Sequence, residues 1–326
     1  ALRDLQDRLD VRTVIGNAAH PDVLERAGAS TADMVIALTN SDEMNMVVCQ
    51  IANTLFDTPT KIARIRAPQY INTPALFQRE NMPIDLVISP EQLVTDYIAQ
   101  LIHYPGAFQV LEFADGKVRL VGVRARQGGA LVGQEISQLT SHLPNIDARV
   151  AAIYRGGFPI RPEGNTVIQE NDEVFFIAAR KDIRVVMGEL RKLEEPVRRV
   201  VIAGGGNIGY RLAAALETTN QVKIIERSRE RAQYLSEMLL NTIVLHGDAA
   251  DEALMLEENV DTADIFVAVT NAEEANILSS MLAKRLGCRK VLVLINRPSY
   301  AALVETGNID VAISPQQVTI GSLLAH

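Results

Sequence analysis

The sequence contains no tryptophan, and only two of its 326 residues are cysteine and five are histidine. Cys49 and Cys288 have no CxxC spacing and both lie in apolar helical patterns, which favours buried, reduced thiols over a disulfide framework. The histidines are scattered, with no helical i, i+4 pair and no nearby cysteine. We therefore predict neither a metal site nor a disulfide.

Positive charge and long apolar runs are also scarce. The formal net charge of −8 argues against a nucleic acid partner, because phosphate backbones are bound by basic surfaces. No run of 18 apolar residues occurs, so we predict no membrane-spanning helix, and without a signal peptide the expected compartment is the cytoplasm. A composition of 48% hydrophobic and 22% charged residues is typical of a globular protein, with about two or three domains at this length.

One stretch dominates the sequence: residues 200–209 read VVIAGGGNIG, an apolar strand followed by a glycine turn and a helix. Its glycines match G-x-G-x-x-G, in which one glycine makes the turn, one admits a pyrophosphate and one lets helix pack on strand. Unpaired N–H groups at the start of the helix favour an anion. We predict a dinucleotide site that includes Gly204, Gly205, Gly206, Asn207, Ile208 and Gly209.

A second apolar strand, residues 222–225, ends in an acid, Glu226. A carboxylate at this place accepts hydrogen bonds from a ribose 2′-OH and repels a 2′-phosphate, which favours NAD(H) over NADP(H). Two alternatives stay open. Arg227 could tolerate a 2′-phosphate, and Glu226 could merely cap the following helix.

The third and fourth strands also end in polar residues, where ligands of parallel sheets collect. Asp248, followed by Ala249, is the candidate adenosine contact, although it could also cap a helix over residues 249–257. Thr270 and Asn271 are assigned to the same cleft.

Two further residues near this cleft have competing explanations. Asn271 and Glu274 have the spacing of a capping box, as do Asn40 and Glu43. Arg297, after the fifth strand, could meet a ligand phosphate, a neighbouring subunit or only a surface acid.

The sequence contains an internal repeat at an offset of 231 residues. Gly16 corresponds to Gly247, residues 32–40 correspond to 263–271, and after a gap residues 88–90 match 313–315. Such agreement predicts two copies of one α/β unit. Thr39 and Asn17 are then the counterparts of Thr270 and Asp248.

The first copy is incomplete. The counterpart of residues 200–231 would precede Ala1, so we expect a fragment whose first copy carries half of a nucleotide site. What remains predicts a helix over residues 2–9 and a short strand over 12–15.

Between the copies the pattern changes to a small α+β domain. Strands are expected at 108–113, 117–123, 151–154 and 173–178, and helices at 134–139 and 181–193. A charged, proline-containing linker, residues 191–199, follows. The predicted domains are 1–105, 106–193 and 194–326.

Residues for catalysis are hard to find. A dehydrogenase needs a proton donor or acceptor beside the nicotinamide, yet the middle domain has one histidine, His142, in a loop pattern, and no Tyr-x-x-x-Lys. A nucleotide site without such groups favours a sensor, in which the ligand shifts a conformational equilibrium. An NAD-dependent oxidoreductase and an oligomerisation scaffold with a vestigial cleft are the alternatives.

Taken together, the motifs resemble the TrkA family of bacterial Trk potassium uptake systems, over essentially the whole chain. The segments that carry the resemblance are 201–209, 225–227, 247–249, 269–271, 274–276 and 310–317. The resemblance implies a fold of two Rossmann-like, doubly wound RCK domains with a parallel sheet, separated by a TrkA-C domain. It also implies that Gly204, Gly206, Gly209, Glu226 and Asp248 hold NAD(H), ATP or ADP.

The same resemblance implies a role and partners. Family members are non-enzymatic cytoplasmic subunits, peripheral on the inner face of the membrane. A homotetrameric ring of RCK domains docks under a membrane-embedded, potassium-conducting Trk subunit, and nucleotide exchange changes the ring's shape and gates the channel.

Overall fold

The computed structural model describes residues 6, 9–78, 80–114, 116–297, 299–300 and 309–324. The chain forms two compact units, Ala1–Leu93 and Val94–His326, and the boundary falls inside helix α5 (Pro90–His103). None of the helices in the described part of the chain has the length and hydropathy needed to cross a membrane.

The first unit contains a parallel three-stranded sheet in the order β1-β2-β3. Its elements are α2 Pro21–Ala27, the 3-10 helix η1 Ala29–Thr31, β1 Met34–Ala37, α3 Asp42–Phe56, β2 Thr60–Arg64, α4 Pro68–Ile71, the 3-10 helix η2 Pro74–Phe77 and β3 Leu86–Ile88. Helix α3 buries Val48, Cys49 and Ala52, and Cys49 and Val48 belong to the same core as Ala63 and Ile65.

The strand predicted over residues 12–15 is wrong, because these residues adopt no regular secondary structure. In the second copy the corresponding strand lies at the sheet edge and pairs with its neighbour, residues 221–226. Among the described residues the sheet of the first unit consists of β1, β2 and β3, and none of these strands pairs with residues 12–15, whose backbone groups therefore form no strand ladder. The helix predicted over 2–9 falls largely outside the described residues.

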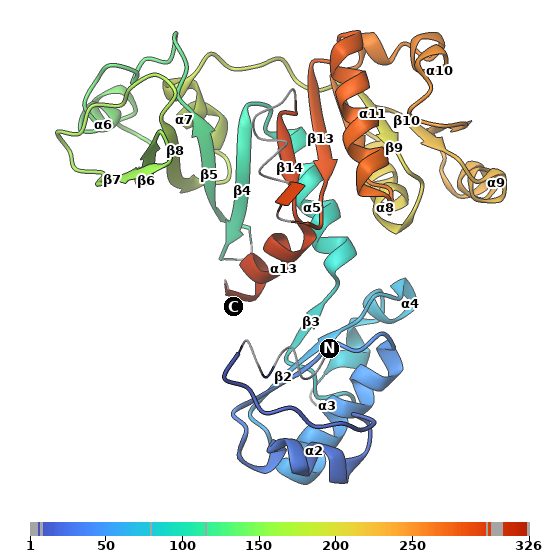
Figure 1. The fold of residues 1–326 in the computed structure, drawn as a ribbon. Coiled ribbons are helices and arrows are strands. Elements are labelled where there is room, and N and C mark those ends of the chain that lie inside the picture. The colour runs from blue at the N-terminus through green and yellow to red at the C-terminus, as the bar shows by residue number, and fades with distance from the viewer. Residues whose placement is uncertain are drawn as a thin grey trace. The chain divides into compact units, whose positions relative to one another are not determined.

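The second unit contains the complete α/β sheet, whose strand order is β11-β10-β9-β12-β13-β14 with all pairs parallel (Figure 1). This is the 3-2-1-4-5-6 order of dinucleotide-binding folds. Its elements are β9 Arg199–Ala203, α8 Asn207–Leu216, β10 Gln221–Glu226, α9 Arg229–Met238, β11 Ile243–His246, α10 Glu252–Glu257, the 3-10 helix η3 Val260–Thr262, β12 Ile265–Ala268, α11 Glu273–Leu286, β13 Lys290–Leu294, β14 Val311–Ile313 and α13 Pro315–Leu324.

The central strands β9 and β12 are apolar along nearly their whole length, as expected where helices cover both faces of a parallel sheet. Every residue of β12 is buried, and so is β9 from Val200 to Ala203. Alternate residues of β9 enter different cores: Ile202 lies in one cluster of buried side chains and Val201 in the other. Helix α8 buries Leu212 and Leu216, as its apolar spacing predicts.

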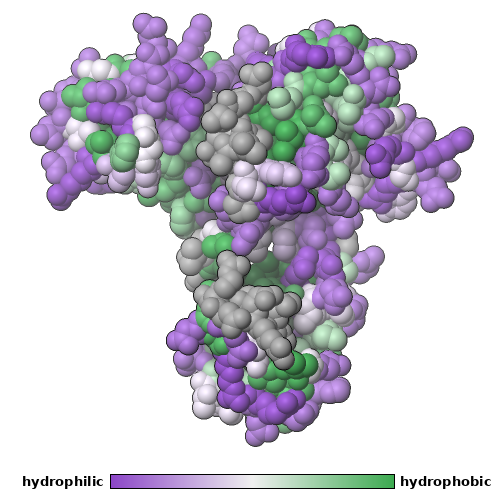
Figure 2. Space-filling view, in the orientation of Figure 1, coloured by the Kyte–Doolittle hydropathy of each residue, from purple (hydrophilic) through white to green (hydrophobic). Residues whose placement is uncertain are grey.

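The middle of the chain forms an antiparallel five-stranded sheet, in the order β4-β5-β8-β6-β7, with two short helices. Its elements are β4 Ala107–Phe113, β5 Val118–Arg124, α6 Gln138–His142, β6 Ala148–Arg155, β7 Phe158–Ile160, β8 Glu173–Ala179 and α7 Ile183–Leu190. Its core is continuous with that of the complete α/β sheet. Its surface is mostly hydrophilic in the view of Figure 2.

The helix predicted over 134–139 is wrong by several residues. Glu135 forms a β-bridge with Val167, and the Ile136 amide donates to the Thr166 carbonyl at 3.0 Å. This pairing between two segments of the same chain occupies the backbone groups that a helix would need, so α6 begins only at Gln138. The helix predicted over 181–193 is confirmed at its centre by α7.

The fold class predicted from the sequence is confirmed. Two parallel α/β sheets flank an antiparallel α+β domain along the chain. Both cysteines are buried and free, as predicted, and burial raises the pKa of Cys49 to about 12 and that of Cys288 to about 11.

Candidate nucleotide-binding site

A cavity of about 320 Å³ lies at the carboxyl ends of β9, β10, β11 and β12. The predicted residues that line it are Gly204, Gly206, Glu226, Arg227, Asp248, Ala249, Thr270 and Asn271. The sheet order reverses between β9 and β12, and ligands of open α/β sheets bind at such a switch point. The structure thus brings together residues that are far apart in the sequence.

The glycine loop shows why glycine is required at three of its positions. Gly204 has a φ of 104°, a left-handed conformation, and a Cβ there would lie 2.8 Å from the Thr270 methyl. A Cβ on Gly209 would lie 1.9 Å from the Gly204 carbonyl oxygen, and one on Gly205 would lie 2.2 Å from Leu235. These three glycines are explained by packing within the protein.

Gly206 differs from its neighbours. A Cβ on this residue would meet nothing within 4 Å, and its φ of −64° suits any amino acid. It is the N-cap of α8, whose first amides have no intrahelical partner. Open space in front of a glycine at a helix N-terminus fits a pyrophosphate that approaches the backbone closely.

Glu226, the last residue of β10, is half-buried and binds the glycine loop. Its Oε2 accepts from the Gly205 amide at 2.8 Å and its Oε1 accepts from the Ser228 amide at 2.7 Å. The alternative that it caps α9 is wrong, because Ser228 is the N-cap and accepts from the Arg231 amide. A carboxylate has about four lone-pair positions, so the two backbone bonds leave capacity for a ribose hydroxyl.

Asp248 is exposed near the start of the loop that follows β11, and its Oδ1 accepts from the Ala250 amide at 2.9 Å. The alternative that it caps the next helix is wrong. Helix α10 begins at Glu252, and Asp251 caps it by accepting from the amides of Ala253 and Leu254. The turn that Asp248 stabilises presents its second carboxylate oxygen as an available acceptor.

Thr270 is held by Asn276, a fully buried side chain of α11. Asn276 Oδ1 accepts from the Thr270 amide (2.9 Å) and hydroxyl (2.6 Å), while its Nδ2 donates to the carbonyls of Thr270 and Leu294. In the first copy, Asn45 binds Thr39 and the Arg64 carbonyl in the same way. The asparagine therefore ties together the ends of two adjacent strands and fixes the cleft wall.

The predicted capping boxes are wrong in both copies. In the second copy Ala272 is the N-cap of α11 and makes no side-chain cap, so Asn271 and Glu274 are not a capping pair. In the first copy Ser41, and not Asn40, caps α3 by accepting from the Met44 amide.

Several predicted residues do not line the cavity. Arg297 forms ion pairs with Glu273 (3.6 Å) and Glu274 (3.5 Å) and lies over the Tyr300 ring. Four residues of the glycine loop support the loop or begin α8: Gly205, Asn207, Ile208 and Gly209. In the first unit, Asn17 Oδ1 accepts from the Ala19 amide at 3.0 Å. The role of each in ligand binding stays a prediction.

Sequence reasoning missed Ser279, a buried residue of α11 that lines the cavity. It lies one helical turn after Ala275, which also lines the cavity, so the helical period of α11 could have identified it. Its hydroxyl donates to the Asn276 carbonyl at 3.2 Å. No group of histidine, cysteine, aspartate or glutamate within the described residues has the arrangement to hold a metal ion.

Comparison with known proteins places these features in context. The TrkA-N domain model matches residues 1–90 and 200–315, and the TrkA-C domain model matches residues 120–191. The Trk system potassium uptake protein TrkA of Halomonas elongata is 60% identical over 325 residues, which are 100% of this chain and 71% of that protein. The TrkA protein of Vibrio alginolyticus is 58% identical over 326 residues, with the same shares.

A solved structure shows the same fold at much lower identity. The GsuK channel bound to NAD is 18% identical, with a TM-score of 0.70 over 98% of this chain and 56% of that chain. At this identity the similarity concerns the fold alone.

Proposed function

We propose a function for this chain on the basis of its family, because it belongs to the TrkA family of potassium uptake proteins. Its relatives support the role of a regulatory subunit in a potassium transport system. We propose further that this chain binds NAD(H), or ATP and ADP, in the cleft of its second α/β sheet. Nucleotide occupancy then changes the conformation of the subunit and gates a membrane-embedded, potassium-conducting partner.

The observation that carries the proposal is the unfilled space at Gly206. Packing within the chain accounts for the glycines at 204, 205 and 209, whereas Gly206 faces open space where α8 begins. Glu226 and Asp248 lie around the same cavity, at the ends of the next two strands. A dinucleotide with its pyrophosphate at Gly206 and a ribose at Glu226 matches this arrangement.

The assembly is part of the proposal. We assign residues 1–105 and 194–326 to two RCK-type domains and 106–193 to a TrkA-C domain. The family role favours a homotetrameric ring on the cytoplasmic face of the membrane, bound to the Trk channel subunit. A ligand that prefers one shape of the ring shifts its equilibrium by the difference between its affinities for the two shapes.

The second candidate function, an NAD-dependent oxidoreductase, makes a different demand on the site. Hydride transfer is usually assisted by a histidine, lysine or tyrosine near the nicotinamide. Among the described residues that line the cavity, the titratable side chains are Glu226, Arg227 and Asp248. Binding and turnover experiments separate the two functions.

We would titrate the chain calorimetrically with NADH, NAD, ATP and ADP in parallel, and then incubate it with NADH and a panel of small carbonyl compounds while following nicotinamide absorbance. Saturable binding near one site per chain without turnover is the expected result. Steady oxidation of NADH would establish the oxidoreductase instead. Absence of binding by all four nucleotides would refute the nucleotide-sensor proposal.

A further inference from the structure

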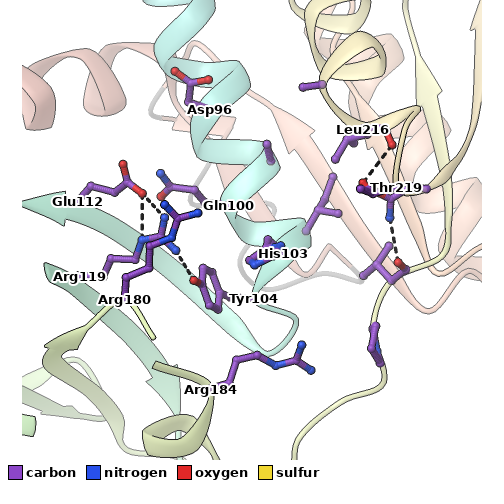
Figure 3. A pocket seen from close by; sticks show the side chains of 16 residues that line it. Asp96, Gln100, His103, Tyr104, Glu112, Arg119, Arg180, Arg184, Leu216 and Thr219 are labelled. Atoms are coloured by element: carbon purple, nitrogen blue, oxygen red, sulfur yellow. Dashed lines mark hydrogen bonds and ion pairs between the residues drawn. The ribbon is translucent and has the colours of Figure 1, made fainter. Parts of the chain in front are cut away.

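A second and larger cavity lies in the Val94–His326 unit, away from the nucleotide cleft. Its volume is about 560 Å³, within the range of small-molecule sites, which is about 300–1,000 Å³. It is bordered by α5, by the sheet of the middle domain and by the C-terminal end of α8 (Figure 3). Its lining includes Arg119, Arg180 and Arg184.

One of the three arginines is already committed to the protein. Arg119 is 5% exposed, and its Nε donates to Glu112 Oε1 at 2.9 Å, while another of its nitrogens donates to the Tyr104 hydroxyl (Figure 3). Glu112 thus neutralises Arg119. Arg119 is buried and Glu112 is exposed, and both side chains line one side of the cavity.

The other two arginines have no ion-pair partner among the described residues, and the carboxylates that line the same cavity are Asp96 and Glu112. Arg180 follows β8, and its amide donates to the Lys117 carbonyl. Arg184 is in the first turn of α7, and that turn contains no acidic residue. Neither side chain makes a hydrogen bond or ion pair with a described residue. Two exposed guanidinium groups beside one cavity are a suitable partner for a dianion.

His103 reports the same positive environment. Burial, together with the positive charges of the three arginines, lowers the pKa of its imidazole. The neutral ring can donate a hydrogen bond without adding charge. Gln100, one turn earlier on α5, adds an amide to the same wall (Figure 3).

The opposite wall is largely apolar. Val197 and Leu216 are buried there, and Ile102 contributes from α5. The Thr219 hydroxyl beside them donates to the Leu216 carbonyl. Such a wall suits the uncharged body of a ligand whose charged group lies at the arginines.

We infer that this cavity binds a small phosphorylated metabolite, with its phosphoryl group at Arg180 and Arg184 and its uncharged body against Val197 and Leu216. The site would be a second ligand site, beyond the proposed nucleotide cleft. Helix α8 connects the two, because its N-terminus is at Gly206 and its last residue, Leu216, lines the cavity.

The test uses the chain with its nucleotide cleft blocked, so that the two sites are read separately. In Gly206→Leu the Cβ would meet no protein atom within 4 Å, and the longer side chain is introduced at a residue that lines the cleft. In this background the chain is titrated calorimetrically with inorganic pyrophosphate at constant ionic strength. The site variant is Arg180→Gln with Arg184→Gln, and the matched control is Lys181→Gln, which removes an adjacent positive charge that does not line the cavity.

We expect pyrophosphate to bind the blocked chain near one site per chain. Affinity should fall about tenfold or more in the double arginine variant and less than about twofold in the control. Absence of binding to the blocked chain, or equal binding by the double arginine variant, would overturn the inference. Tighter binding of citrate than of pyrophosphate would overturn the assignment of a phosphoryl group. Nucleotide titrations of the unblocked chain are independent of all these outcomes.

Discussion

The glycine loop offers a sharp test, because Gly206 and Gly209 should respond differently to the same added methyl group: one variant should lose nucleotide affinity and the other should lose stability. In Gly209→Ala the new Cβ would lie 1.9 Å from the Gly204 carbonyl oxygen, so backbone must move. We expect a loss of about 1–3 kcal/mol of unfolding free energy, the range for overpacking. Part of this cost is offset because alanine favours a helix over glycine by about 1 kcal/mol.

In Gly206→Ala the new Cβ meets no protein atom within 4 Å and φ is already −64°. Stability should change by less than about 1 kcal/mol, since the only cost is a poorer N-cap residue. NADH affinity, however, should fall by about tenfold or more, equivalent to about 1.4 kcal/mol or more, because the methyl group occupies the place of the pyrophosphate.

Urea unfolding gives the stability of both variants, and calorimetric titration with NADH gives the affinity of Gly206→Ala. The reasoning fails if Gly206→Ala is folded and binds NADH as tightly as the parent chain. It also fails if Gly209→Ala is as stable as the parent, because the close approach of α8 to the loop would then be absent.

Four further predictions concern the residues around the cleft and the core. Glu226→Gln should reduce the preference for NADH over NADPH by about tenfold, because a neutral side chain no longer repels a 2′-phosphate. Glu237→Gln is the control, and an unchanged ratio of the two affinities in Glu226→Gln would contradict the ribose assignment. Asn276→Ala should lower the unfolding free energy by about 2–3 kcal/mol in urea denaturation, since buried backbone groups of two strands lose their partner. Burial alone would raise the pKa of Asp264, but hydrogen bonds from the amides of residues 199 and 198 lower it below the unfolded-state value of 3.8. The ionised carboxylate therefore stabilises the fold above pH 3.8, and this stabilisation is lost as the pH falls through the lowered pKa of the folded state. Asp264→Asn should accordingly show a shallower loss of stability in acid, and an identical pH profile would count against this role. The two cysteine thiols, Cys49 and Cys288, should react slowly with a disulfide reagent at pH 8 in the folded chain and rapidly in urea, because burial keeps both protonated; rapid labelling of the folded chain would show that they are accessible.

The features that could be predicted from the sequence were those that depend on neighbouring residues or on a regular spacing. The apolar strand, glycine turn and helix at residues 200–209 lie within one βα unit, and their order and spacing identified the nucleotide fold. The ends of the third and fourth strands gave Asp248 and Thr270 as cleft residues, and the repeat then gave Asn17 and Thr39 as their counterparts in the first copy.

What could not be predicted depends on partners distant in the sequence. Residues 12–15 have strand-like composition, but no strand in the described part of the chain pairs with them. The bridge between Glu135 and Val167 delays the start of α6. The structural role of Asn276 depends on a residue 18 positions away, because its bond to the Leu294 carbonyl joins two strands. The predictions of helix caps were wrong for another reason. Neighbouring residues such as Asp248 and Asp251 have equal capping ability, and only the backbone geometry determines which of them caps the helix.

The most direct test of the central claim is a crystal structure of this chain with NADH. The account predicts the pyrophosphate at the Gly206 amide and the N-terminus of α8, the adenosine ribose within hydrogen-bond distance of Glu226, and the adenine beside Asp248. Well-defined NADH bound elsewhere, with the space in front of Gly206 filled only by water, would contradict it.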